Sequence, residues 1–121
     1  MKYTRKEVHE IRKSLNDAYC KIEKVFDSIE TQEHYNTFYN MCQNLLKICT
    51  FWDEELRPSR PYFLHKKQDK LYDMFYYTAK DVVDKMNFLI DLYNDAAAEQ
   101  AEYEKRYEAV QEQISKLQEL E

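Results

Sequence analysis

Residues 72–117 have the sequence YDMFYYTAKDVVDKMNFLIDLYNDAAAEQAEYEKRYEAVQEQISKL, and this stretch decides the fold. Its apolar side chains recur in alternating steps of three and four, which is the spacing of one face of an α-helix. A single polar residue, Gln100, interrupts the series. A continuous helix over about 64–120 would be roughly 80 Å long at 1.5 Å per residue. The series consists of Tyr72, Phe75, Ala79, Val82, Met86, Leu89, Tyr93, Ala96, Gln100, Tyr103, Tyr107, Val110, Ile114 and Leu117.

The two halves of this predicted helix differ in the width of their apolar face. With Tyr72 at heptad position a, the e positions are apolar in the first half and polar in the second. A wide face is typical of a multi-helix bundle, and a narrow a/d seam is typical of a two-stranded coiled coil. We therefore expect the second half to form a homodimer, with Gln100 setting the register. The predicted seam consists of Tyr103, Tyr107, Val110, Ile114 and Leu117.

Two shorter helices precede this segment. The first is predicted over about 4–29, because Thr4 and Glu7 have the spacing of a capping box. The second is predicted over about 32–56, where the apolar series continues out of phase with the first by one residue. That change of phase places a tight break near residues 30–33, and Thr31 can cap the second helix. The two helices are therefore expected to form an antiparallel hairpin.

We predict an all-α fold in which this hairpin packs on a long C-terminal helix with coiled-coil character. The whole chain, residues 1–121, is expected to be one helical domain, with a proline-containing loop over 57–63. The alternative is an up-down-up-down four-helix bundle, in which the last helix breaks at Asn94–Asp95. The unbroken heptad phase across that dipeptide favours the continuous helix.

The composition excludes several classes of protein. Glycine is absent from all 121 residues, so no phosphate-binding loop, dinucleotide fingerprint or nucleophile elbow can be present. Three cysteines without a CxxC motif favour a reducing compartment, and no apolar run reaches the length of a membrane span. No signal peptide is visible, and we expect a cytoplasmic protein that does not contact a membrane.

No metal or cofactor is expected. Cys42 and Cys49 share a helical face but are separated by about 10.5 Å of helix, too far for one zinc ion or a disulfide. They are predicted to be core residues, whereas Cys20 falls on an outer face. The inward stripes are apolar and contain no Glu-x-x-His pair of the kind used by di-iron bundles.

Arg60 and His65 are the weak candidates for catalytic residues. The stretch from Arg60 to His65, RPYFLH, has the spacing Arg, four residues, His. This resembles the Arg-x4-6-His signature of HEPN-type ribonucleases, which are small α-helical domains. The resemblance implies an RNA-binding or RNA-cleaving domain, in which the neighbouring lysines hold phosphates. The residue after Arg60 is Pro61, where that family commonly has a polar residue, and the net charge of −5 opposes approach to a polyanion. We therefore expect neither an enzyme nor a nucleic-acid-binding protein.

Positive charge is concentrated around the predicted loop. Such a patch can bind phosphate or acidic groups, or it can simply be a solvated loop and first helical turn. The solvated surface is the simpler interpretation. The candidate basic patch consists of Arg57, Arg60, Lys66, Lys67 and Lys70.

Three further apolar residues, Phe51, Met74 and Phe88, fall at position c of their helices, outside the predicted core faces. Exposed aromatic and methionine side chains are enriched at protein interfaces, so we expect a protein contact there. The leading functional hypothesis is a non-enzymatic interaction protein: an adaptor, an assembly factor or a small inhibitor. In composition the chain is similar to small acidic helical proteins encoded by phages and mobile elements, which implies a phage accessory protein.

Overall fold

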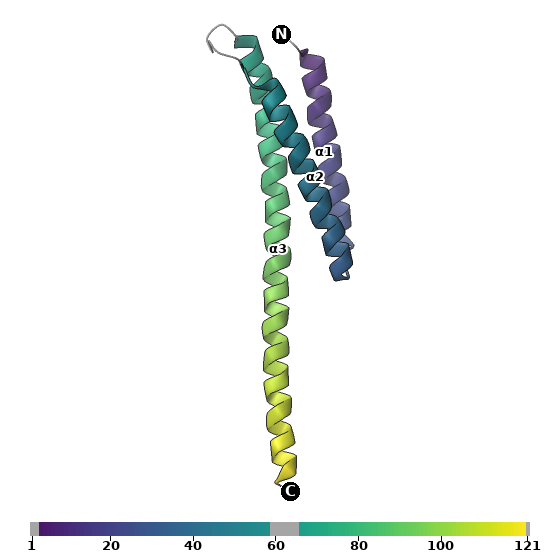
Figure 1. Ribbon diagram of the computed structural model, residues 1–121, viewed down its shortest axis with the longest axis vertical. Coiled ribbons are helices and arrows are strands. Elements are labelled where there is room, and N and C mark those ends of the chain that lie inside the picture. The colour runs from purple at the N-terminus through teal and green to yellow at the C-terminus, as the bar shows by residue number, and fades with distance from the viewer. Residues whose placement is uncertain (1–2, 59–65, 121) are drawn as a thin grey trace. The chain divides into compact units, whose positions relative to one another are not determined.

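The computed structural model describes residues 3–58 and 66–120, and nearly all of them are helical. The helices are α1 (Arg5–Asp27), α2 (Gln32–Leu56) and α3 (Lys66–Glu119) (Figure 1). The predicted all-α class is confirmed. The four-helix alternative is wrong, because α3 continues through Asn94 and Asp95 without a break. The predicted start of this helix near residue 64, and most of the predicted loop over 57–63, lie outside the described residues.

The beginnings of α1 and α2 are set by the predicted capping residues. The Thr4 hydroxyl accepts a hydrogen bond from the Glu7 amide at 3.2 Å, and the Glu7 carboxylate accepts one from the Thr4 amide at 3.3 Å. The Thr31 hydroxyl accepts a hydrogen bond from the His34 amide. Each cap satisfies backbone donors that the first turn of a helix leaves without a partner.

The chain divides into two compact units, Met1–Asn87 and Phe88–Glu121. In the first unit, α1 and α2 pack as the predicted hairpin, and the first part of α3 packs against both (Figure 1). Its core is apolar and draws on all three helices. The buried side chains of this unit include Val8, Leu15, Tyr19, Ile22, Phe38, Cys42, Leu45, Cys49, Leu56, Leu71, Phe75, Ala79, Val82 and Met86.

Polar contacts join α3 to the hairpin at the edges of this core. The Tyr72 hydroxyl donates to the Asp53 carboxylate on α2, and Arg57 also pairs with Asp53. On the α1 side, the Lys85 ammonium lies 5.4 Å from the centre of the Tyr19 ring. These contacts fix α3 to both helices of the hairpin.

The buried face of α3 is wide. At position e, Val83 and Ile90 are half-buried, but near the beginning of the helix the other flank is buried. Tyr76 at position e is 40% exposed, whereas Leu71 and Thr78 at position g are buried. The sequence pattern did not mark Thr78 as a core residue because it is polar. Its hydroxyl is satisfied by the Met74 carbonyl one turn earlier on the same helix, at 3.2 Å.

Candidate functional site

The second unit exposes the predicted seam. Tyr103, Tyr107, Val110, Ile114 and Leu117 are all exposed, from 43% for Ile114 to 65% for Leu117. They recur at steps of four and three on one stripe of α3. An apolar stripe of this length on an otherwise polar surface is typical of a protein-binding surface.

This part of α3 is stabilised as a helix by local interactions. The segment from Ala96 onward is rich in Ala, Glu, Gln and Lys, which are strong helix formers, and it contains no proline. Arg106 pairs with Glu102 at 2.7 Å and Lys116 with Glu112 at 3.5 Å, with the acidic residue on the N-terminal side. That orientation is the more favourable one for pairs four residues apart. The helix can therefore present its apolar stripe to a partner without refolding.

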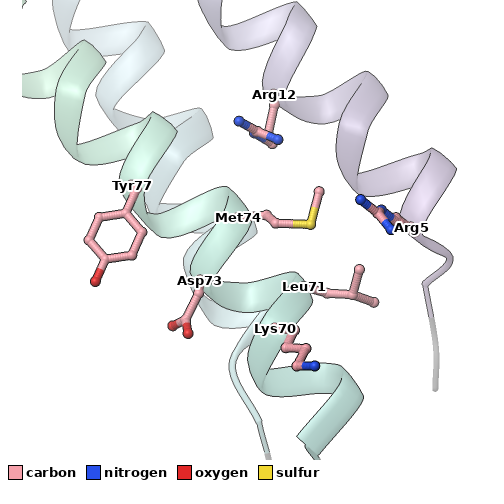
Figure 2. Close-up of a pocket in the computed structure, with 7 residues that line it drawn as sticks. All are labelled: Arg5, Arg12, Lys70, Leu71, Asp73, Met74 and Tyr77. Atoms are coloured by element: carbon pink, nitrogen blue, oxygen red, sulfur yellow. The ribbon is translucent and has the colours of Figure 1, made fainter.

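The first unit contains a groove between α1 and the beginning of α3, with a volume of about 730 Å³. Figure 2 shows its lining side chains, of which two come from α1 and five from α3. The groove is lined by Arg5, Arg12, Lys70, Leu71, Asp73, Met74 and Tyr77.

The floor and rim of this groove differ in chemistry. Leu71 and Met74 point from α3 toward α1, where they face Arg5 and Arg12 (Figure 2). The Arg12 Nε donates a hydrogen bond to the Thr78 hydroxyl at 2.8 Å, which holds this side chain across the groove. Its terminal NH₂ groups carry the remaining four N–H donors of the guanidinium. The result is an apolar floor beneath fixed positive charge.

The three additional candidate interface residues have different surroundings. Met74 is partly buried in the groove between α1 and α3. Phe51 is 53% exposed on α2, where its ring contacts Trp52 with centroids 5.0 Å apart. Phe88 is 65% exposed at the beginning of the second unit. Met74 is therefore the one of the three that lines a groove described here.

The candidate basic patch is divided among different environments. Arg57 pairs with Asp53 and lies over the Tyr72 ring, and the hydrogen bond to Asp53 raises the pKa of its guanidinium. Lys70 lines the groove. Lys66 and Lys67 lie in the first turn of α3, and their side chains are outside the described part of the structure. Arg60 and His65, the candidate catalytic pair, also lie outside the described part of the structure.

The cysteines have the environments that their helical positions predict. Cys42 and Cys49 are buried and Cys20 is exposed, all three as free thiols. Burial raises the pKa of the Cys42 thiol to about 11 and also raises the pKa of Cys49. These two core thiols are therefore poor nucleophiles. Within residues 3–58 and 66–120, no three metal-binding side chains are grouped so as to hold an ion.

Sequence reasoning missed the groove, although it singled out Lys70 and Met74 separately. Arg5 and Lys70 are more than sixty residues apart in the chain, and nothing in the sequence connects one with the other. Their proximity depends on how α1 packs along α3. Neither the spacing of apolar residues nor any sequence motif predicts how these two helices pack.

Among the described helices, none is both long enough and apolar enough to cross a membrane. Comparisons with protein-family models, curated proteins and solved structures found no match.

Proposed function

We propose that this chain is a non-enzymatic interaction protein that pairs with a second copy of itself through the seam of α3. The observation that supports this proposal is the exposure of all five seam residues, Tyr103, Tyr107, Val110, Ile114 and Leu117. Fully burying a Val, Leu or Ile side chain stabilises a protein by about 1.5–3 kcal/mol. Roughly half of that gain is still available at each of these aliphatic positions. Burial of these side chains between two paired seams would provide this free energy.

The flanks of the seam support a single partner helix. Position e is occupied by Glu104, Gln111 and Gln118, which leaves only a narrow apolar line for contact. Gln100 lies at an a position, and a polar residue there favours one register over others. Its side-chain amide donates to Glu104 within the same helix at 3.2 Å, an exposed contact that a partner amide can replace.

The dimer would then present its helical surfaces to another macromolecule, as an adaptor, an assembly factor or a small inhibitor does. A phage or mobile-element origin is consistent with the small size and acidic composition. A partner protein that binds through the dimer is expected to lose affinity when the seam is disrupted. A partner protein that binds the first unit alone is expected to keep its affinity.

The seam can be tested without disturbing the core, because its residues are exposed in the single chain. We expect Ile114→Asp combined with Leu117→Asp to abolish association in sedimentation velocity. The matched control is Ala101→Asp combined with Ala109→Asp, which adds the same charge to the same helix outside the seam. Helical content by circular dichroism is expected to stay within about 10% in both variants, since surface substitutions rarely unfold a domain. Equal association of both variants would overturn the proposal.

A further inference from the structure

The groove between α1 and α3 differs in charge from two further grooves of the first unit. The groove between α1 and α2, about 350 Å³, is lined by Glu7 and Glu10, and none of its described lining residues is basic. The groove between α2 and α3, about 260 Å³, is lined by Asp53, Asp84 and Lys80. The described lining of the α1–α3 groove combines three basic residues with one acidic residue and carries a net positive charge.

The side chains that line this groove lie on different sides of α3. Asp73 and Tyr77 lie on the side of α3 away from α1, whereas Leu71 and Met74 point toward α1 (Figure 2). Asp73 still lines the groove, so its described lining sets one carboxylate against the positive charges of Arg5, Arg12 and Lys70. A group that enters the groove meets apolar side chains and a net positive charge.

The size of the groove favours a small molecule over a partner helix. The lining residues extend over Arg5–Arg12 on α1 and Lys70–Tyr77 on α3, which is roughly 12 Å of each helix. Small-molecule sites have volumes of about 300–1,000 Å³, mostly apolar walls and a few fixed polar groups. The volume of the groove lies in this range, and Arg12 is a fixed polar group beside the apolar side chains of Leu71 and Met74.

We propose that this groove binds an amphiphilic monoanion, an alkyl chain that ends in a carboxylate. The alkyl chain lies on Leu71 and Met74, and the carboxylate accepts hydrogen bonds from the terminal nitrogens of Arg12. Arginine suits this role because its planar guanidinium offers two parallel N–H donors to a carboxylate. Arg5 and Lys70 add positive charge at the rim.

The first experiment uses dodecanoate, below the concentration at which it forms micelles, with the full chain carrying ¹³C-labelled methyl groups. We expect saturable binding with the largest shifts at the Met74 and Leu71 methyls. Dodecyltrimethylammonium, which has the same alkyl chain and the opposite charge, is expected to bind at least about tenfold more weakly. Equal affinity for the two amphiphiles would overturn the proposal, as would shifts centred on Val110, Ile114 and Leu117 or the absence of saturable binding.

The second experiment assigns the charge to the groove. Arg5→Glu combined with Lys70→Glu changes two exposed side chains and is expected to weaken dodecanoate binding about tenfold. Lys6→Glu combined with Lys13→Glu makes the same change in net charge at exposed positions outside the groove, and is expected to change affinity by less than about twofold. An equal loss in both variants would mean that net charge alone attracts the ligand, and the proposal would be wrong.

This inference does not depend on the proposed dimer. The variant with Asp at positions 114 and 117 is expected to bind dodecanoate with unchanged affinity, because the groove lies wholly within the first unit. Loss of dodecanoate binding in that variant would place the ligand on the seam and contradict the groove assignment.

Discussion

Arg12 on α1 donates a hydrogen bond from Nε to the hydroxyl of Thr78 on α3, at 2.8 Å. Thr78 is the buried polar residue of the described core, and its hydroxyl also donates to the Met74 carbonyl at 3.2 Å. The Thr78 hydroxyl therefore donates a hydrogen bond within α3 and accepts one from Arg12 on α1. The contact joins α1 to α3 beside the groove.

Removing this hydroxyl is expected to destabilise the first unit. Thr78→Val keeps the shape of the side chain but leaves the Arg12 Nε without its acceptor, so we expect a loss of about 1–2 kcal/mol. The matched control is Thr50→Val, because Thr50 is exposed on α2 and donates to the Leu46 carbonyl in the same way. We expect less than about 0.5 kcal/mol there. Urea denaturation of both variants measures the difference, and equal losses would show that the helix-to-helix bond contributes nothing.

The three thiols are expected to react at very different rates. Cys20 is exposed, whereas Cys42 and Cys49 are buried and have raised pKa values. A colourless disulfide reagent that releases a coloured thiolate should therefore detect one thiol in the native protein and all three in denaturant. Cys20→Ser should abolish the fast reaction. Rapid reaction of a second thiol in the native state would contradict the burial of the α2 cysteines.

Alkaline pH is expected to destabilise the fold through Cys42 and Tyr19. Burial raises the pKa of Cys42 from 9.0 to about 11, and burial with a hydrogen bond to Glu23 raises the pKa of Tyr19 from 10.0 to about 12. Both groups are neutral below their ordinary pKa values, so their contribution is fully present below about pH 9. It is lost as the pH rises from 9 to 12, because the unfolded chain ionises first.

Urea midpoints at several pH values between 8 and 11 measure this effect. Cys42→Ala lowers stability at every pH by removing packed atoms, but it should also make the decline above pH 9 less steep. An unchanged slope in Cys42→Ala would contradict the role given to this thiol.

Cleavage of RNA by Arg60 and His65 is testable directly. We expect no metal-independent cleavage of single-stranded RNA, because the net charge of −5 opposes binding of a polyanion. The assay uses the full chain at low salt, with Arg60→Ala and His65→Ala as separate variants. Cleavage by the unmodified chain that disappears in both variants would establish an enzyme and contradict the proposed function.

The helical architecture could be predicted because its signals are local. Thr4 with Glu7, and Thr31 alone, mark the beginnings of α1 and α2, and the structure has both caps. The unbroken phase through Asn94 and Asp95 predicts one long helix, and α3 is continuous there. Each of these signals lies within a few residues of the feature that it determines.

The flank on which α3 packs and the groove beside it could not be predicted. Apolar residues at Tyr76 and Val83 suggest the e flank, and Val83 is half-buried, but the neighbouring helices also cover the g flank at Leu71 and Thr78. Periodicity fixes which residues share a face, and it carries no information about the angle at which another helix meets that face. The groove depends on this angle, so nothing in the sequence brings its lining residues together.

Self-association of the unmodified chain tests the central proposal most directly. Sedimentation equilibrium at micromolar concentration is expected to give twice the chain mass of 14.9 kDa, because the exposed seam gains burial only when a second copy covers it. A mass of 14.9 kDa at every concentration in that range would contradict the proposal that Tyr103, Tyr107, Val110, Ile114 and Leu117 form a dimer interface.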